Sequence, residues 1–331
     1  MSTMLAVTTV PAHLRSRGSS AVADDAWTVR QLTGGVSGAV FSAFDGRERF
    51  VVKQSLDKLA VDDDWSAPRE RILNEARALD LLGEIIPTHS PTVLDVDPET
   101  LTLTMEHAPS DWTDWKGELL SDAVDAPLTR RLGEALATVH AATANAAWSI
   151  PPDDGAAGFL ALRIEPFHHT VAERMPEFRV QLLGIAERIL DTRECFVHGD
   201  FSPKNILVAP PGADRGFWII DDEVAHRGDP VFDLAFFLSH LALKRIRATD
   251  DVKPLFDQAA RAFVEGYQDI RGDIDSSALS QQIGALVLSR IAGRSPVRYL
   301  DQRQRDAAVA VGAQLLTHSA DFRRTHPLEI I

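Results

Sequence analysis

The sequence predicts an α+β protein of two lobes, a small N-terminal antiparallel sheet with one helix and a larger, mainly helical C-terminal lobe. Two observations indicate this fold class. Short apolar runs with a single helical segment occupy residues 26–107, whereas long helical patterns dominate residues 108–331. The chain of 331 residues is long enough for two cores of ordinary size. Residues 1–25 are rich in small and polar side chains, and we expect a partly disordered leader there.

Strands account for most of the N-terminal lobe. Residues 29–32 and 49–54 are predicted strands on either side of a glycine-rich segment. Residues 93–97 and 101–105 are predicted to form a hairpin, because a Pro-Glu-Thr turn separates two short apolar runs. Neighbouring strands joined by short connections predict an antiparallel sheet.

Helical periodicity identifies the remaining elements. Residues 69–83 form the one predicted helix of the first lobe, since Ile72, Ala76, Leu79 and Leu82 recur on one helix face. In the second lobe we predict helices over 128–143, much of 172–191 and 255–268, and a helix over 231–238 that is apolar nearly all round. A helix without a polar face is typical of a buried position.

The charge and cysteine content exclude several classes of protein. A formal net charge of −14 disfavours non-specific binding to nucleic acid or anionic membrane, and would suit a cationic substrate. Cys195 is the only cysteine, which excludes an intramolecular disulfide and a thiolate metal cluster. No apolar run approaches the roughly 20 residues that cross a bilayer, and the start of the chain lacks the features of a signal peptide. We therefore expect a cytoplasmic protein with no nucleic-acid and no membrane partner.

A polar loop in the second lobe is the most informative segment. Asp200 follows His-Gly in a tight turn, Asn205 comes shortly afterwards, and a strand begins at once. Asp221 then ends another apolar run. In kinases the first aspartate accepts the proton of the attacking hydroxyl, and the asparagine and later aspartate hold magnesium on the nucleotide phosphates. The alternative interpretation is a turn rich in Asp and Asn before a strand.

The glycine-rich segment between the first two strands is a second candidate. Here Gly34, Gly35, Ser37 and Gly38 would let backbone amides approach phosphate oxygens without a Cβ in the way. No Gly-Lys-Ser/Thr follows, and a strand rather than a helix comes next, so neither a Walker nor a Rossmann motif is present. A plain hairpin turn remains the alternative.

Lys53 and Glu75 are predicted to form an ion pair. Lys53 lies in an apolar strand, where an ammonium must reach water or a charged partner. Glu75 lies on the inward face of the helix over 69–83, where burying a carboxylate is unfavourable unless it has a charged partner. The pair would present the ammonium to nucleotide phosphates. Otherwise Lys53 is an edge-strand lysine and Glu75 a flanking residue.

Four further residues around the polar loop have expected roles. His198 is predicted to brace the loop by hydrogen bonding, and Asp233, inside the apolar helix, to accept hydrogen bonds from the loop amides. Glu223 is a second candidate ligand, after Asp221, for a hard cation such as Mg²⁺, whereas Asp222 is expected to face solvent.

In this order, the motif around Asp200 and Asn205, with Asp221 and Asp233, resembles the aminoglycoside phosphotransferase and choline kinase-like superfamily. The resemblance covers about residues 27–300 and implies the bilobal protein-kinase-like fold, with ATP and Mg²⁺ as cofactors. It also implies that Asp200 is the base and that Asn205 and Asp221 hold the metal.

The resemblance assigns two more sets of residues in the N-terminal lobe. The segment Gly34–Gly38 would be the phosphate loop, with Lys53 and Glu75 as the ion pair beneath it. The adenine hinge would be formed by Met105, Glu106, His107 and Ala108.

Within the superfamily, several segments are similar to methylthioribose kinases. They are residues 52–54 with Trp65 ahead of Arg71 and Glu75, residues 115–120, and the Asp-x-Glu of residues 221–223. Residues 289–293 are similar to a substrate-side arginine segment of those kinases, which implies that Arg290 contacts the substrate. One arginine stands there where the methylthioribose kinases have a pair.

The function predicted from these observations is transfer of the ATP γ-phosphoryl group to a hydroxyl of a small molecule. A sugar or sugar-like acceptor of the methylthioribose kind is the first choice, and an aminoglycoside is the alternative. A catalytically silent nucleotide-binding regulator is the alternative from another class. A protein kinase is disfavoured, because the short stretch between Asn205 and the helix at 231 leaves little room for a peptide-binding segment.

Overall fold

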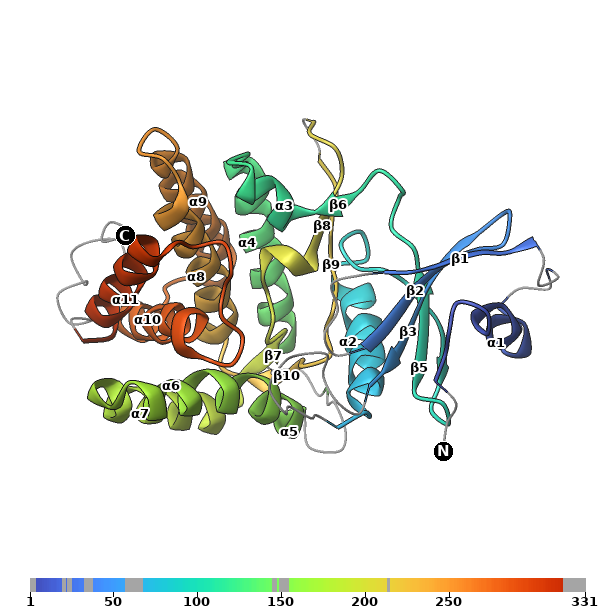
Figure 1. Cartoon of the computed structure of the whole chain (residues 1–331), viewed down its shortest axis with the longest axis horizontal. Coiled ribbons are helices and arrows are strands. Elements are labelled where there is room, and N and C mark those ends of the chain that lie inside the picture. The colour runs from blue at the N-terminus through green and yellow to red at the C-terminus, as the bar shows by residue number, and fades with distance from the viewer. Residues whose placement is uncertain are drawn as a thin grey trace.

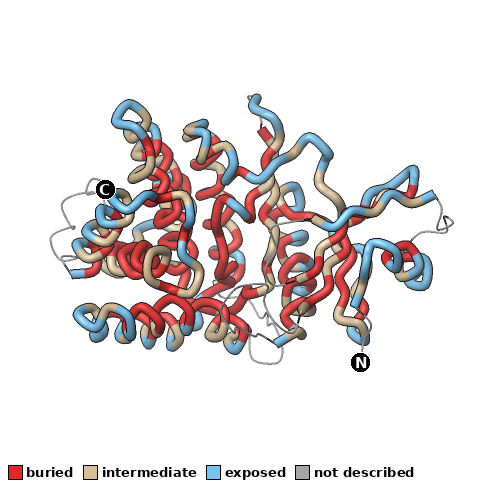
Figure 2. Tube along the Cα trace, viewed as in Figure 1, coloured by how far each residue is buried: buried red, intermediate tan, exposed pale blue. Residues whose placement is uncertain are grey.

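The computed structural model describes residues 4–19, 22, 26–32, 38–56, 68–144, 148, 155–212 and 215–317. The described chain forms a strand-rich N-terminal lobe and a larger helical lobe, drawn in blue-green and in green to red (Figure 1). The expected α+β architecture of two unequal lobes is confirmed. Buried residues run through the interior of both lobes, and exposed residues line the outer turns (Figure 2).

The N-terminal lobe is a five-stranded antiparallel sheet in the order β1-β2-β3-β5-β4. Its strands are β1 (Thr28–Gln31), β2 (Gly38–Phe44), β3 (Arg49–Ser55), β4 (Val93–Asp97) and β5 (Thr102–Glu106). Successive side chains of a strand point to opposite faces. On β3, Val51 therefore faces helix α2 (Arg71–Ile85), whereas Phe50 and Val52 face the other side.

Helix α1 (Val10–Ser16) covers that other side of the sheet. Val10 and Leu14 are fully buried against Phe41 and Val52. The partly disordered leader predicted over residues 1–25 includes this helix within its described residues 4–19. The small-residue composition of the segment conceals the apolar stripe formed by Val10 and Leu14.

The helical lobe has one large apolar core. Its helices are α3 (Trp115–Leu120), α4 (Ala126–Thr143), α5 (Ala156–Phe159), a π-helix (Leu160–His169), α6 (Thr170–Arg174), α7 (Arg179–Asp191), α8 (Val231–Arg247), α9 (Lys253–Arg271), α10 (Ser276–Ala292) and α11 (Gln302–Thr317). Helices α4 and α9 pack closely because Gly133 has no side chain, and a Cβ there would lie 2.1 Å from the Phe263 carbonyl oxygen. The apolar helix expected over 231–238 is the buried start of α8.

The helix expected over much of 172–191 differs in detail. A break at Met175 and a 3₁₀ turn (Pro176–Phe178) separate α6 from α7. The break lies before Pro176, which disfavours a helical residue in front of it. No helix among the described residues is long and apolar enough to span a membrane.

Two small sheets connect the helical lobe to the polar loop. One is β10 (His226–Gly228) paired with β7 (Cys195–Val197), and the other is β6 (Thr113–Asp114), β8 (Ile206–Val208) and β9 (Phe217–Ile219). The loop between β7 and β8 includes a 3₁₀ turn (Pro203–Asn205). The β8–β9 pairing brings residues 205 and 220 together, so the two polar segments of the sequence become neighbours.

Candidate active site

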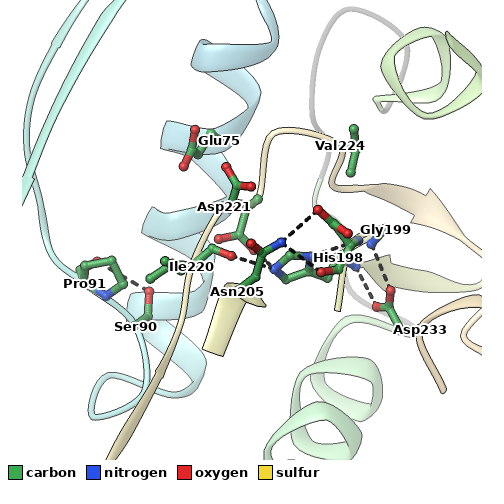
Figure 3. Close-up of polar contacts among 12 residues, drawn as sticks. Glu75, Ser90, Pro91, His198, Gly199, Asn205, Ile220, Asp221, Val224 and Asp233 are labelled. Carbon is green, nitrogen blue, oxygen red and sulfur yellow. Dashed lines mark hydrogen bonds and ion pairs between the residues drawn. The ribbon is translucent and has the colours of Figure 1, made fainter. Parts of the chain in front are cut away.

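Asp233, on the first turn of α8, holds the polar loop in place through hydrogen bonds to the loop backbone (Figure 3). Its two carboxylate oxygens accept hydrogen bonds from the backbone N–H groups of His198 at 2.7 Å and Gly199 at 2.9 Å. The buried His140 ring lies 3.4 Å away through Nε2. Burial alone would raise the pKa of Asp233, but its hydrogen bonds and nearby histidines lower it instead. The loop thus rests on a buried carboxylate.

Gly199 has a backbone conformation that the tight turn requires. Its φ is +75°, in the left-handed region that favours glycine. A Cβ at this position would also lie 2.9 Å from the Val224 carbonyl oxygen. His198 completes the turn, because its Nδ1 lies 3.1 Å from the Asp200 amide and its Nε2 lies 3.2 Å from the Ile220 carbonyl oxygen. Together these contacts fix the direction in which Asp200 leaves the loop.

Asp200 and Asn205 are directly hydrogen-bonded to each other. The Asn205 Nδ2 donates to the Asp200 carboxylate Oδ2 at 2.9 Å and to its carbonyl oxygen at 3.0 Å. Both residues are 4% exposed. Because Nδ2 donates to Asp200, the amide oxygen Oδ1 is the Asn205 atom that could bind a ligand.

Two cations also hold the Asp200 carboxylate. Arg163, from the π-helix, lies 2.9 Å from Oδ2 and also donates to the Gly199 carbonyl, and Lys204 lies 2.8 Å from the same carboxylate oxygen. Burial by itself would raise the pKa of Asp200, but Arg163 and Lys204 outweigh it and lower the pKa below its ordinary value. The carboxylate is therefore ionised and able to accept a proton.

Lys53 bridges the two lobes. Its Nζ lies 2.5 Å from Glu75 Oε1 on α2 and 2.8 Å from Asp221 Oδ1, which follows β9 (Figure 3 shows the two carboxylates facing each other). Burial would lower the pKa of Lys53, but the carboxylates of Asp221 and Glu75 outweigh it and raise the pKa. Glu75 and Asp221, which the sequence placed on a helix and after a strand, thus meet at the ammonium group of Lys53.

Asp221 has a strained backbone. Its φ is +72°, a conformation that costs a non-glycine residue roughly 1–2 kcal/mol. Burial would raise the pKa of its carboxyl group, but Lys53 and Lys204 lower it well below the usual range. Strain of this kind in native proteins is concentrated at functional sites, where surrounding contacts maintain it.

Asp222 differs from the sequence-based expectation. We expected its side chain to face solvent, but it is 0% exposed and lies 3.5 Å from the His198 Nε2, so that expectation was wrong. The reason is a tight turn, closed by the Ala225 amide donating to the Asp222 carbonyl at 3.0 Å, which keeps the residue inside the protein. Burial raises the pKa of Asp222 to about 6.

Glu223 is bound by an arginine. Arg71, which is 1% exposed on α2, places Nε 3.0 Å from the Glu223 carboxylate and donates to two loop carbonyls, those of Leu56 and Pro68. Glu223 nevertheless contributes to the electrostatics of the site, since it raises the pKa of Lys53. This second ion pair links the helix α2 to the segment after Asp221.

The donor set fits a magnesium ion that takes its other ligands from phosphates and water. Asp221 contributes carboxylate oxygens and Asn205 an amide oxygen, both of which a hard cation prefers. Within the described residues, no three His, Cys, Asp or Glu side chains gather into a metal site of their own. Mg²⁺ in nucleotide sites is usually held by only one or two carboxylates together with the phosphates.

The remaining predicted residues are only partly described. Gly34, Gly35 and Ser37 lie outside the described residues, whereas Gly38 begins β2 and pairs with Ser55 of β3. In the expected hinge, Met105 and Glu106 end β5 beside β3 and β4, and His107 and Ala108 follow directly as the chain leaves the sheet. Arg290 lies near the end of α10, with its Nε buried and without a partner among the described residues.

Sequence reasoning missed three charged residues of this site. Arg163 and Arg71 contact carboxylates that are far away along the chain, so the sequence around each arginine does not reveal its partner. Lys204 is different, because it lies within the polar loop, next to Asn205. Its position four residues after Asp200 was a signal that the two side chains could meet.

A sequence profile of a known family covers most of this site. The profile of the family described as "Phosphotransferase enzyme family" matches residues 28–275. This range includes residues of both lobes, the loop of Asp200 and the whole of α8. The chain belongs to this family. The match begins at β1 and therefore leaves out α1, while Arg290 lies beyond its end.

Curated relatives of this phosphotransferase-family chain include methylthioribose kinases. The methylthioribose kinase of Citrobacter koseri is 26% identical over 235 residues, which is 62% of this chain and 57% of that protein. That of Enterobacter sp. strain 638 is 25% identical over 232 residues, with the same coverage of both chains. The chain thus spans less than two thirds of the length of these relatives.

Solved structures of small-molecule kinases share the fold. A microcompartment-associated aminopropanol kinase has a TM-score of 0.56 at 15% identity, covering 98% of this chain and 99% of that one. A fructosamine-3-kinase homologue from Thermobifida fusca has a TM-score of 0.55 at 21% identity, covering 94% and 99%. These likenesses confirm the bilobal kinase-like fold.

Proposed function

We propose that this member of the phosphotransferase family is a kinase that transfers the γ-phosphoryl group of ATP to a hydroxyl of a small molecule. One observation carries the proposal. Lys53 joins Glu75 and Asp221 between the lobes, next to the ionised Asp200 with its partner Asn205. A lysine that pairs with a helix glutamate and a metal-site aspartate, beside a carboxylate base, is the arrangement that phosphoryl transfer requires.

The chain's own residues divide the work between the two lobes. Asp200 accepts the proton of the acceptor hydroxyl, and its low pKa keeps it deprotonated for that step. Lys53 binds phosphate oxygens, while Glu75 fixes the direction of its ammonium. Lys204, which is 44% exposed and lies between Asp200 and Asp221, is placed to meet charge on the transferred group. Positioning and charge stabilisation are the main sources of catalysis in this reaction.

Asp221 and Asn205 would hold the magnesium ion, and Gly34–Gly38 would cover the phosphates. When bound, Mg²⁺ neutralises charge on the β- and γ-phosphoryl oxygens. The Lys53 contact already places Asp221 Oδ1 at the lysine and leaves Oδ2 turned towards Lys204, at 3.9 Å. A sugar or sugar-like alcohol is the acceptor we favour, supported by the methylthioribose kinase relatives.

The test is ADP release from Mg-ATP with a panel of hydroxyl acceptors: methylthioribose, pentoses and hexoses, amino alcohols and aminoglycosides. Acceptor-dependent release by the wild-type protein would support the proposal, and turnover of an aminoglycoside alone would favour that alternative. Tight Mg-ATP binding without turnover of any acceptor would favour a silent nucleotide-binding regulator. A protein that does not bind Mg-ATP would refute the proposal.

We expect Asp221→Asn to lose magnesium-supported activity. The substitution removes one carboxylate charge from the metal site, and we expect kcat to fall by about 10²–10³-fold, as for loss of one preorganised charge-stabilising group. Asparagine tolerates the left-handed backbone at this position, so the fold should persist. The measurement is kcat as a function of magnesium concentration, with circular dichroism as the folding control. Unchanged activity at low magnesium would contradict the role of Asp221.

We expect Arg163→Met to shift the acid limb of the pH–rate profile. Activity requires ionised Asp200 and is lost as the pH falls through its pKa, which Arg163 helps to lower. Without the guanidinium the pKa of Asp200 rises, so the acid limb should move to higher pH. The measurement is kcat/KM from about pH 3 to pH 9, because the lowered pKa of Asp200 places the wild-type limb below about pH 4. Arg188→Met, which removes an arginine from Asp229 instead, is the matched control and should leave the limb in place.

A further inference from the structure

A buried lysine without a carboxylate partner lies on α8. Lys244 is 0% exposed, and its Nζ is only 3.4 Å from the His240 carbonyl oxygen and 5.7 Å from the centre of the Tyr299 ring. Among the described residues Lys244 forms no ion pair. An unpaired ammonium in the interior is costly, and its donors call for an acceptor.

Arg290 and Tyr299 add two more donors beside it. The Arg290 Nε and the Tyr299 hydroxyl are buried and have no hydrogen-bond partner among the described residues. The segment after α10 is held in place, because the Val297 amide donates to the Arg290 carbonyl at 2.8 Å and Arg305 donates to the Ile291 carbonyl at 3.0 Å. Arg290 and Tyr299 thus each have a buried donor that no described residue accepts from, and the Tyr299 ring lies beside Lys244.

The surroundings of Lys244 are rich in positive charge. Burial, followed by the charges of Lys116, Arg290 and Arg247, lowers the pKa of Lys244 to about 7, and Asp114 opposes this only in part. Of these neighbours, Arg247 is paired with an aspartate, Asp122, whereas Arg290 and Lys116 have no ion pair within the described part of the chain. Of these side chains Lys244 is fully buried, Arg290 and Arg247 are partly buried and Lys116 is exposed, and an anion beside Lys244 would favour its charged form.

This cationic group belongs to the same region as the proposed base. The guanidinium carbons of Arg290 and Arg163 lie 5.9 Å and 5.8 Å from the centre of the Phe167 ring, and Arg163 contacts Asp200 at 2.9 Å, so Arg290 lies near the base. Lys116 is on α3, which packs against the turn Pro203–Asn205 of the catalytic loop. A molecule whose hydroxyl meets Asp200 therefore has its other end close to these donors.

Resting on the proposed function, we infer that the acceptor carries an anionic group, a carboxylate or a phosphate, and that Lys244, Arg290 and Tyr299 bind it. Each would donate a hydrogen bond to an oxygen of that group, and bonds from charged donors to anionic oxygens are the strong ones. The inference reverses the expectation from the net charge of −14, which by itself suits a cationic substrate. The net charge is summed over the whole protein, whereas an acceptor interacts with the charges around its own binding site.

The experiment compares hydroxylated ligands that differ in a single charged group. Calorimetric titrations of the protein with saturating Mg-ADP would use glucose, glucuronate, glucose 6-phosphate and glucosamine, and then glycerol and glycerate. We expect at least one acid to bind at least about tenfold tighter than its neutral counterpart, the gain of about one charge-assisted hydrogen bond. Preference for glucuronate and glycerate would identify a carboxylate, and preference for glucose 6-phosphate a phosphate.

Lys244→Met tests whether this lysine causes the preference. Methionine has a similar volume and no charge, so the helix should pack as before. We expect the variant to lose at least about tenfold of the preference for the acid over the neutral ligand. Lys253→Met is the matched control, because it removes the same charge from a more exposed pair with Asp250 that includes none of these donors. The control should keep the full preference.

The outcomes separate this inference from the proposed function. Equal binding of acids and neutral ligands, tighter binding of glucosamine, absence of acid binding, or an unchanged preference in Lys244→Met would each overturn the inference. Mg-ATP binding and acceptor-dependent ADP release are measured on the same samples. If neutral acceptors are phosphorylated, the kinase stands and only the anionic acceptor fails. If Mg-ATP does not bind, the proposed function fails as well.

Discussion

Asp200→Asn is expected to lower kcat by about 10²–10⁴-fold, which is the usual contribution of a general base. The asparagine side chain keeps the size of Asp200 and can still contact the cations Arg163 and Lys204 through its oxygen. It cannot take the proton of the acceptor hydroxyl. The affinity for Mg-ATP should therefore stay within a few-fold of the wild-type value, since Lys53 and Asp221 are untouched.

The measurements for Asp200→Asn are kcat by ADP release and the dissociation constant of Mg-ATP by calorimetry. Asp97→Asn is the matched control, because Asp97 is a buried aspartate that binds the Glu99 amide and the Thr100 hydroxyl in a hairpin of the other lobe. Its activity should be close to wild type. An Asp200→Asn variant that retained most of its activity would show that Asp200 is not the base.

Asp233→Leu is expected to be the most destabilising single substitution in the site. Leucine leaves the buried N–H groups of His198 and Gly199 without an acceptor and removes the charge beside His140. Removing one partner of a buried charged network costs about 3–5 kcal/mol. The free energy of unfolding should therefore fall by about that amount, and the loop that positions Asp200 should lose its order.

The pH dependence gives Asp233→Leu an independent signature. The folded-state pKa of Asp233 is depressed, so its contribution to stability is present at neutral pH and is lost as the pH falls through that pKa. The stability difference between wild type and variant should thus shrink below about pH 4. Urea denaturation at several pH values measures it. Asp257→Asn, which breaks a more exposed pair with Arg245, should cost less than about 1 kcal/mol, and an equal cost would contradict the bracing role of Asp233.

The fold could be predicted where local pattern and tertiary structure agree. Helix α2 was predicted because its apolar residues recur on one face, and the contact of Glu75 with Lys53 explains why that face also holds a carboxylate. The loop of Asp200 and Asn205 is a short local motif, so the sequence alone indicates its chemistry. Helix α1 was missed because its three buried residues, Val10, Pro11 and Leu14, are too few to produce a periodic signal.

The rest of the candidate site depends on contacts that the sequence does not reveal. Arg163 lies in an irregular helix and reaches Asp200 from 37 positions earlier in the chain. Asp222 was expected to face solvent, but the chain turns soon after β9 and keeps this residue inside the protein. Lys244 ends an apolar stretch and looks like an ordinary helix-terminal lysine until the packing of α8 is known.

Helix α1 affects the choice of the N-terminal boundary for a shortened form of this protein. The family match starts at residue 28, so a protein shortened to that boundary would lack the helix. Phe41 and Val52 would then be uncovered on the open sheet face, and exposed apolar patches promote aggregation. The bond from the Leu5 amide to Gln54, the strand neighbour of Lys53, would be lost as well. A boundary taken from homology alone thus removes the helix that covers one face of the sheet, and this is the sheet in which Lys53 lies.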